Sequence, residues 1–428
     1  MDARDQAIDD LAKLMDVNVV AGDHNQVSVF TSTGLQLVGA AAAKLSFDAQ
    51  ATINAAAQWS SDPSQRTLGT IVLQGSNSGD VDLIANRSIR SGTIAGMLEM
   101  RDQALVQAQA QLDGISAALA SALSDGTTNG TPTPPGPQSG FDIDLAGILP
   151  GNSVRVTYTD RTTNTQHTLT LVRVDDAAAL PLSNAATNDP NDKVIGLNFS
   201  AGPGSVASQL NAALGSTRLQ FSNPAGTTLR IIDDGAANRV DVDAVTATKT
   251  ATTLVGGTPQ LPFFLDGTSA YSGAISATGS QAVGLAGRIV LNPSLLADPS
   301  KLVVYQTSPA TPAGDATRPN FILDQLTSAG LSFSPQTGIG TASMPFSGSL
   351  PDFLRQVVST QGAAAEAADN LKQGQDVVYN ALQQRFSASS GVNMDQEMAN
   401  LLNLQNAYAA NARVLSTVKD MLAALLNI

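Results

Sequence analysis

The chain has 428 residues, of which 43% are hydrophobic, so it is long enough for two or three domains with buried cores. Charged residues make up only 14%, and the formal net charge is -13. Nucleic acid and anionic membranes bind clustered Lys and Arg, and the sequence has no basic run, so both are excluded as partners. The absence of cysteine excludes disulfides, thiolate metal sites and cysteine nucleophiles.

The sequence carries no sign of a secretory signal or a membrane span. Its start, MDARDQAIDDLAKL, is acidic and amphipathic and lacks the basic and apolar parts of a signal peptide. No apolar stretch approaches the roughly 20 residues that cross a bilayer, and Lys419 and Asp420 interrupt the C-terminal tail. We therefore expect no membrane insertion, and any export must use a route that removes no such peptide.

Residues 1–125 predict a helix, β-hairpins and a second helix. Residues 3–15 are amphipathic, and VNVVAGDHNQVSVFTSTGLQLV alternates apolar residues between Gly-Asp and Thr-Gly turns, which is typical of a hairpin. TLGTIVLQG and VDLIA predict further strands. From 96 to 123 the spacing becomes helical, and a seven-residue repeat indicates a bundle seam. The seam residues here are Leu98, Leu105, Leu112 and Leu119.

The middle of the chain has a different composition. Residues 126–140, GTTNGTPTPPGPQSG, are rich in Pro, Gly and Thr and predict a linker that forms neither a helix nor a central strand. Residues 141–346 contain many short strand patterns between turns and predict one or more inserted, mainly antiparallel β-rich domains. Within them we expect a helix at 206–214 and a strand, turn and strand in GRIVLNPSLLADPSKLVVY.

Two helices are predicted to complete the chain. Residues 347–388 form a returning bundle helix, whose seam we expect to pack against the first one inside a single domain. Its seam residues are Leu354, Val357, Leu371, Val378 and Leu382. After a break at SASSGVN, residues 389–428 predict an amphipathic assembly helix capped by Ser390 or Asn393.

The assembly helix carries a long apolar stripe at heptad spacing. The stripe residues, which we also expect to bind a chaperone, are Met394, Met398, Leu401, Gln405, Tyr408, Ala412, Leu415, Val418, Leu422, Leu425 and Leu426. The predicted fold class is α+β, with long bundle or coiled-coil helices at both ends and an inserted β-rich region.

The motifs that could carry chemistry are weak. GPGSVA at 202–207 matches G-x-G-x-x-A and opens a helix, but the next strand ends without an acidic residue, and a Gly-Pro turn before a short helix explains the pattern better. His24 and His167 have no metal-ligand spacing and no G-x-S-x-G partner. We therefore expect no catalytic residue, no cofactor and no metal.

Three carboxylate pairs could in principle bind calcium or act in acid-base catalysis. They are Asp175 with Asp176, Asp233 with Asp234, and Asp241 with Asp243. Adjacent aspartates in turns are more often solvated, and no twelve-residue calcium loop is present.

The two ends of the chain resemble flagellar axial proteins. SGVNMDQEMANLLNLQNAYAANARV is similar to the C-terminal pattern of the FlgK family of hook-associated proteins, where SGVN-[LM]-D-x-E-x-ANL precedes QxAYxANARV. DARDQAIDDLAKLMDVNVV resembles that family's D-x-RDQ helix and hairpin, and SIRSGTIAGMLEMRDQALVQAQAQL resembles its following G-x-L-x-G-L helix. The β-rich middle is the variable part of this family.

The resemblance implies a structural, non-enzymatic subunit of the junction between hook and filament. Such a protein is secreted by the flagellar type III pathway after a transient cytoplasmic state in which an export chaperone covers its C-terminal helix. Outside the cell it forms an axial ring by self-association and contacts the hook protein and a second hook-filament junction protein. Family members carry a further helix before the D-x-RDQ helix, so we expect Met1 to be an internal methionine and the C-terminal helix to lack that partner.

The residues alone leave two other classes of function open. One is a secreted adhesin or carbohydrate-binding module with oligomerising helices, for which the β-rich middle would bind glycans. The other is an enzyme, such as a hydrolase in the β-rich region, which would depend on residues such as Asp233 or His167.

Overall fold

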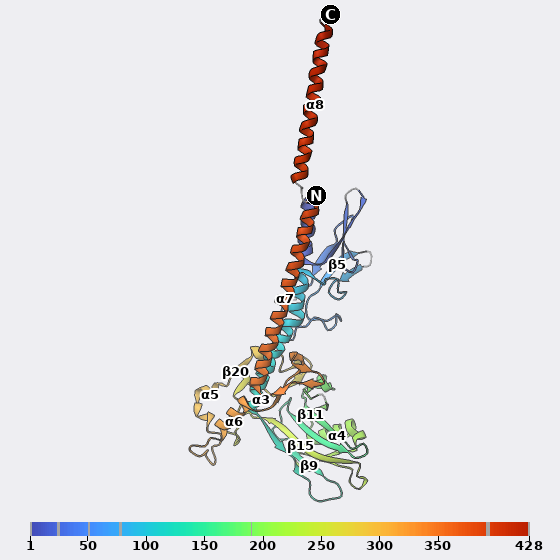
Figure 1. Ribbon diagram of the computed structural model, residues 1–428. Coiled ribbons are helices and arrows are strands. Elements are labelled where there is room, and N and C mark those ends of the chain that lie inside the picture. Colours follow the sequence, from blue (N-terminus) through green and yellow to red (C-terminus); the bar gives the residue numbers. More distant parts are fainter. Residues whose placement is uncertain are drawn as a thin grey trace. The chain divides into compact units, whose positions relative to one another are not determined.

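The structure is a computed structural model that describes residues 2–23, 26–49, 52–76, 79–189, 191–390 and 394–426. It divides into two compact units, Met1–Val357 and Val358–Ile428, of which the first contains all the sheets (Figure 1). Helices and small, mostly antiparallel sheets together make an α+β fold, as the sequence predicts.

The N-terminal part of the first unit combines one helix with two three-stranded antiparallel sheets. The elements are α1 (Asp2–Leu14), β1 (Val17–Ala21), β2 (Val27–Thr31), β3 (Gln36–Val38), β4 (Lys44–Phe47), β5 (Ile71–Ser76) and β6 (Gly79–Asp82). The predicted helix and hairpin are thus confirmed. Their shared core is formed by Met15, Val29, Leu37, Leu73 and Leu83, all buried.

A long helix follows, and a π-helical turn interrupts it. α2 (Gly92–Glu99) leads through the π turn Met100–Ala104 into α3 (Leu105–Ser124). The guanidinium of Arg101 binds the Asp102 carboxylate and donates to the carbonyl of Gly69 at 2.9 Å, which ties the turn to a neighbouring loop. A π turn closes i to i+5 bonds and therefore shifts the phase of a helix, so a seven-residue repeat counted across it does not keep one face.

Between 125 and 250 the chain forms two sheets around one core. The elements are β7 (Asp125–Asn129), β8 (Thr131–Pro132), β9 (Gly140–Asp144), β10 (Ser153–Asp160), β11 (Thr165–Arg173), β12 (Asp192–Leu197), α4 (Pro203–Leu214), β13 (Gln220–Ser222), β14 (Thr228–Ile232) and β15 (Val240–Thr250). The sheet orders are β12-β11-β10-β15-β7 and β13-β14-β9-β8, antiparallel except for the parallel β11–β12 pair. The helix predicted at 206–214 is confirmed, with a start three residues earlier.

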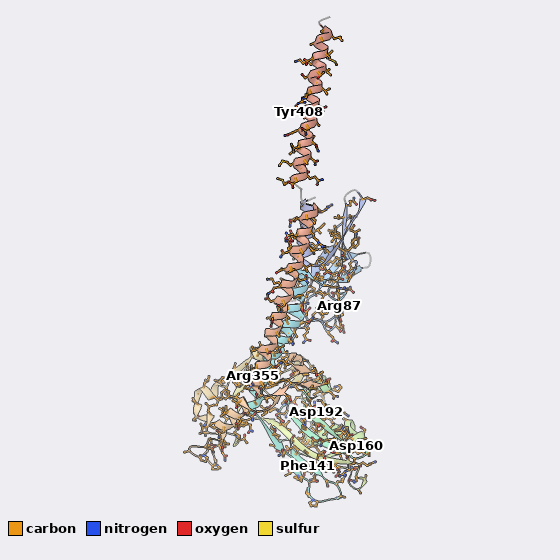
Figure 2. All side chains as sticks on the ribbon, in the orientation of Figure 1. Arg87, Phe141, Asp160, Asp192, Arg355 and Tyr408 are labelled. Carbon is orange, nitrogen blue, oxygen red and sulfur yellow. The ribbon has the colours of Figure 1, made fainter. Side chains whose placement is uncertain are left out.

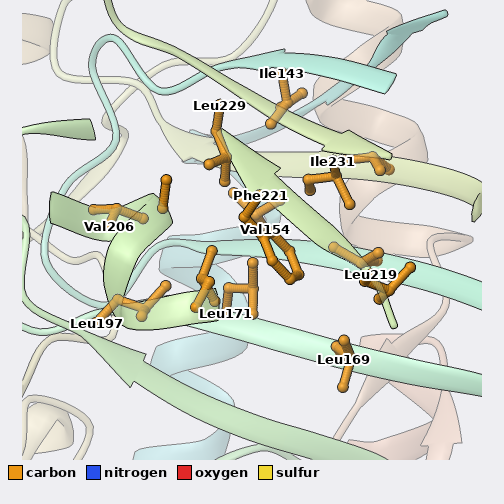
Figure 3. Packing of buried hydrophobic residues seen from close by; sticks show 14 of the residues in the cluster. Ile143, Val154, Leu169, Leu171, Leu197, Val206, Leu219, Phe221, Leu229 and Ile231 are labelled. Carbon is orange, nitrogen blue, oxygen red and sulfur yellow. The ribbon is translucent and has the colours of Figure 1, made fainter. Parts of the chain in front are cut away.

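The core of this region follows from strand alternation. Along β10, Val154, Val156 and Tyr158 point inward with a period of two, while α4 adds Val206 and Leu210. Figure 3 shows Val154 and Val206 among residues of both sheets. At about 25 cal/mol per Å² of apolar area removed from water, this cluster is a main source of stability for the unit.

The predicted linker 126–140 is partly folded. Residues 126–129 and 131–132 belong to β7 and β8, which lie at the edges of the two sheets, so the description as a linker is wrong for these residues. The exclusion of a central strand holds for them, but it is wrong for Gly140, which opens β9 between β14 and β8. Thr and Gly do not prevent an edge strand when a neighbour offers a free ladder, and here β15 and β9 do so.

Residues 251–349 contain short elements around irregular segments. The elements are β16 (Phe264–Asp266), β17 (Ser269–Ala270), β18 (Ile275–Ser276), β19 (Gly279–Ser280), β20 (Ile289–Leu291), α5 (Pro293–Ala297), α6 (Thr317–Thr327), β21 (Leu331–Ser332), β22 (Gly340–Thr341), β23 (Met344–Pro345) and β24 (Ser347–Gly348).

The predicted strand, turn and strand in GRIVLNPSLLADPSKLVVY is wrong after its first strand. β20 is present, but α5 and a 3₁₀ turn, Pro299–Leu302, replace the second strand. The side chain of Asn292 accepts a hydrogen bond from the Ser294 N–H at 3.0 Å, and that of Asp298 caps the 3₁₀ turn. A capping side chain followed by proline at the first helical position favours a helix start, and this local signal prevails over the strand pattern.

Two helices complete the chain, α7 (Leu350–Ser390) and α8 (Met394–Leu426). α7 begins where the sequence predicts a returning helix, and its first turns pack into the first unit through Leu350 and Phe353. The ring of Phe353 stacks on that of Phe333 with centroids 3.7 Å apart. The predicted break at SASSGVN is helical up to Ser390, while residues 391–393, including the predicted cap Asn393, lie outside the described residues.

Candidate assembly surface

The candidate assembly surface is the apolar side of α8, and the structure leaves it accessible. Every described residue of this helix is exposed, in contrast to the buried clusters of the first unit. Tyr408, labelled in Figure 2, is 79% exposed, and Leu415 is 71% exposed. All eleven residues predicted for the assembly stripe belong to α8, so the helix itself is confirmed while their role stays a prediction.

The C-terminal half of α8 has a second apolar stripe, of which the sequence pattern predicted only Val418 and Leu425. Val414, Val418, Met421 and Leu425 follow i, i+4, i+7 and i+11 spacing and are exposed. At 100° per residue this stripe lies about 80° around the helix from Leu415 and Leu422. The two stripes together cover about half of the circumference, and Arg413, Ser416, Thr417 and Asp420 occupy the rest.

The residues of the predicted bundle seam lie in different environments. Leu119 and Val357 pack against one cluster with Phe333 and Phe353. Leu105 and Leu112 are exposed, and the buried residues of α3 instead include Gln111, Asp113 and Ser116. Leu98 is half-buried, and Leu354, Leu371, Val378 and Leu382 are exposed. A continuous seam therefore stays a prediction.

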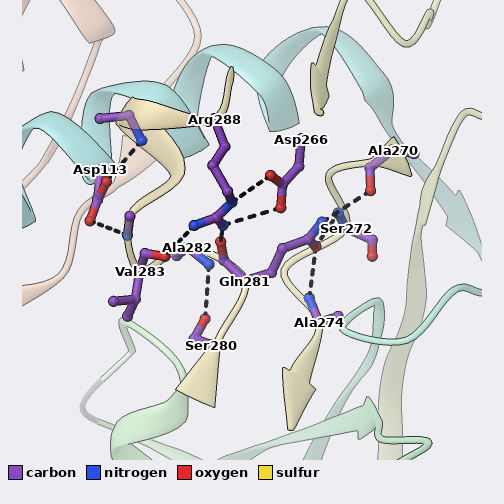
Figure 4. Close-up of polar contacts among 12 residues, drawn as sticks. Asp113, Asp266, Ala270, Ser272, Ala274, Ser280, Gln281, Ala282, Val283 and Arg288 are labelled. Carbon is purple, nitrogen blue, oxygen red and sulfur yellow. Dashed lines mark hydrogen bonds and ion pairs between the residues drawn. The ribbon is translucent and has the colours of Figure 1, made fainter. Parts of the chain in front are cut away.

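The buried polar face of α3 holds a loop rather than a ligand. The Asp113 carboxylate accepts hydrogen bonds from the Gly284 and Ala286 N–H groups at 2.7 and 2.9 Å (Figure 4). Arg288 closes the same loop by binding the Asp266 carboxylate with two nitrogens. Each charge is thus used to fix the chain, which indicates a structural cluster.

The nucleotide-like stretch 202–207 is the start of α4. Gly202 has φ of +79°, which glycine adopts without strain, and Pro203 occupies the first helical turn. Val206 and Ala207 are buried in the core. The stretch therefore begins a core helix, as the structural interpretation predicts.

The candidate catalytic groups are engaged in local contacts. The ring of His167 stacks on that of Tyr158 across β10 and β11, with centroids 5.2 Å apart. His24 lies outside the described residues.

The aspartate pairs bind backbone N–H groups or neighbouring side chains. Asp176 accepts from the Ala178 and Ala277 N–H groups, and Asp234 binds Arg239. The partners of the other four are also local: Arg173 for Asp175, Gly235 for Asp233, Arg161 for Asp241, and Thr159 for Asp243. These contacts fit structural roles for the three pairs.

The described residues hold neither a metal-binding cluster nor a membrane-spanning helix. No group of three or more His, Asp or Glu side chains among them could hold a metal ion. None of the helices in the described ranges is long and apolar enough to cross a membrane.

Comparison with known proteins matches both ends of the chain. The model of the flagellar hook-associated protein FlgK helical domain matches residues 1–140, and that of the flagellar basal body rod FlgEFG protein C-terminal region matches residues 383–428. The flagellar hook-associated protein 1 of Escherichia coli (strain K12) is 23% identical over the whole chain. Together these matches support a FlgK-type hook-associated protein.

These matches cover the elements at both ends of the chain. The FlgEFG-type match covers α8 and the end of α7, and the FlgK-type match covers α1 to α3 with the N-terminal sheets. The family is one of structural flagellar proteins and not an enzyme family. The chain spans 64% of the length of the curated relative it matches.

Proposed function

We propose that the chain is a structural, non-enzymatic subunit of the bacterial flagellum at the junction between hook and filament. It acts as part of an extracellular ring that forms by self-association and contacts the hook protein and a second junction protein. The observation that carries this proposal is the exposed apolar half of α8, on a chain whose two ends match hook-associated and rod-type families.

The physical properties of α8 support assembly through this helix. Its 33 residues span about 50 Å at 1.5 Å per residue. A helix gains most of its stability in water from covering its apolar face, and α8 exposes both of its stripes. Two stripes about 80° apart fit a helix with neighbours on two sides better than a single pair of helices.

The same property supports a chaperoned route out of the cell. An exposed apolar helix is prone to unwanted association before assembly, so we propose that an export chaperone covers α8 in the cytoplasm and that the flagellar type III pathway secretes the chain. The low content of charged residues and the absence of cysteine fit a route without disulfide formation.

The test compares Leu415→Glu with Thr417→Glu in the full chain. Both add one negative charge to α8, but Leu415 lies on the apolar half and Thr417 on the polar half. We expect Leu415→Glu to abolish both assembly, measured by sedimentation and cross-linking with hook protein, and swimming in cells that depend on the chain. We expect Thr417→Glu to preserve both. Equal behaviour of the two variants would refute assembly through this face.

A further inference from the structure

Arg318 is the largest side chain that the described residues bury completely. It lies in α6 of the first unit, near the start of the helix. Buried arginines are usually paired with carboxylates because an isolated buried charge is costly. In the described part of the chain, however, the guanidinium hydrogen bonds only to backbone carbonyl oxygens.

Six carbonyl oxygens surround this guanidinium. Nε donates to Pro259 at 3.0 Å, and one terminal nitrogen donates to Thr258 and Gln260 at 3.0 and 3.2 Å. The other terminal nitrogen contacts three more oxygens. These are the carbonyls of Leu254 at 2.8 Å, Lys301 at 2.6 Å and Val304 at 3.1 Å. All five N–H groups of the fork thus have acceptors.

The charge persists in this site. Burial lowers the pKa of Arg318 to about 10, which still leaves the guanidinium protonated at neutral pH. The ring of Tyr305 adds a cation-π contact at 5.6 Å, and the Tyr305 hydroxyl donates to Asp315. Six carbonyl dipoles and one ring face therefore stabilise the cation in place of a carboxylate.

The oxygens come from two irregular segments, 254–260 and 301–304. Segment 254–260 has no strand or helix, and segment 301–304 contains the end of a 3₁₀ turn and the residues after it. A backbone bond from the Gly257 N–H to the Tyr305 carbonyl, 2.9 Å long, also joins these parts of the chain. Without the guanidinium, these six acceptors around a fully buried side chain would have to find new donors or water.

We propose that these six carbonyl oxygens form a guanidinium-binding site, which Arg318 fills from within, and that segments 254–260 and 301–304 adopt their fold only when a guanidinium occupies it. The ligand class is a planar cation with several N–H donors. Lysine would supply the charge but only three donors from one nitrogen. The proposal is independent of the flagellar role, which holds or fails on α8.

The test is chemical rescue of the full chain. We expect Arg318→Ala to increase amide hydrogen exchange in 254–260 and 301–306 by about tenfold or more. Guanidinium chloride at about 10 mM, far below denaturing concentration, should restore much of the protection in a saturable way, whereas the same concentration of sodium chloride should not. Arg318→Lys should show intermediate protection. If Arg318→Ala does not fold, the yield on refolding with and without guanidinium gives the same readout.

Arg230→Ala is the matched control. Arg230, on β14, is partly buried and pairs with the Asp142 carboxylate on the neighbouring strand β9, so its loss should leave exchange in 254–260 unchanged and insensitive to guanidinium. Wild-type protection in Arg318→Ala would overturn the proposal. So would a loss of protection that guanidinium does not restore, or an equal response to guanidinium in Arg230→Ala.

Discussion

The two ends of α7 carry leucines in opposite environments. Leu350, at the start of the helix, is buried with Phe333, Ile339 and Phe353 in the first unit. Leu371, six turns further on, belongs to the second unit and is 66% exposed. Helical periodicity is present at both ends, so the pattern alone says only that a face is apolar. What covers that face differs between the two units.

This contrast extends to the units as wholes. The first unit buries several hydrophobic clusters and fixes its loops with paired or carbonyl-bound charges. In the second unit every described residue from 361 to 388 and from 394 to 426 is exposed. We infer that the first unit carries its own stability and that the helices of the second gain theirs from partner surfaces, because helices without a covered face are marginal in water.

The largest expected difference is between Leu350→Ala and Leu371→Ala. Truncating the buried leucine should lower the free energy of unfolding of the first unit by about 2–4 kcal/mol, from lost burial and the cavity left behind. Truncating the exposed one should change it by less than about 0.5 kcal/mol. Urea unfolding, monitored by hydrogen exchange in the first unit, measures the free-energy change in both variants. A similar loss in the two variants would show that the contrast between the ends of α7 is false.

A second comparison is between substitutions in α8 in the free chain and the same substitutions in the assembled state. Leu422→Ala should leave the unfolding of the free chain almost unchanged, but it should weaken the assembled state by about 2–4 kcal/mol per subunit if partners bury this side chain. Thr417→Ala, on the polar half of α8, should have little effect in either state. The critical concentration for assembly is the measurement. An equal critical concentration for Leu422→Ala and the unchanged chain would contradict partner burial.

The pH dependence of the first unit should depend on Asp125, at the joint between α3 and β7. Burial raises the pKa of its carboxyl, and hydrogen bonds from Thr250, Ser124 and Ser121 only partly offset this. The folded state therefore holds this proton more tightly than the unfolded state. The contribution to stability is present below the unfolded pKa of about 4 and is lost as pH rises through the higher folded pKa.

Asp125→Asn removes this titration. We expect the stability of the Asn variant, relative to the unchanged chain, to increase as pH rises above about 4. Asp82→Asn is a control of opposite sign. Burial tends to raise the Asp82 pKa, but bonds from the Ala85 N–H, Thr70 and Arg66 outweigh it and lower the pKa. Its stabilising effect is present above the unfolded pKa and lost at lower pH. Unfolding curves from pH 3 to 7 that run parallel for all three chains would refute both assignments.

The parts of the fold that follow a repeating pattern could be predicted from the sequence. The helices at both ends, the first hairpin and the stripe of α8 depend on periods of 3.6 or 2 that local sequence contains. The π turn at Met100–Ala104 could not be predicted in this way, since MRDQA fits an ordinary helix and the turn involves Arg101 reaching Gly69. The exposure of Leu105 and Leu112 could not be predicted either, because a seven-residue repeat marks an apolar stripe but not what covers it.

Arg318 shows why polar sites formed by distant segments cannot be predicted from a repeating sequence pattern. Its acceptors are backbone oxygens from two segments between 254 and 304, and backbone oxygens are the same in every residue. No side chain in these segments marks the site, so only the folded chain shows it. The aspartate pairs carry the opposite risk. Their side chains suggest a binding site in the sequence, but in the folded chain they make ordinary turn contacts.

The smallest expected difference is between the loss of a helix-capping side chain and the loss of an exposed one. Asn292 caps α5 through the Ser294 N–H and donates to the Pro262 carbonyl at 2.8 Å, so Asn292→Ala should cost about 1 kcal/mol of stability in the first unit. Asn411→Ala, in the exposed middle of α8, should change the free chain by less than about 0.5 kcal/mol. Thermal unfolding of the two variants under one condition measures the difference. If Asn411→Ala cost more than Asn292→Ala, α8 would already be packed in the free chain, and its need for partners would have to be abandoned.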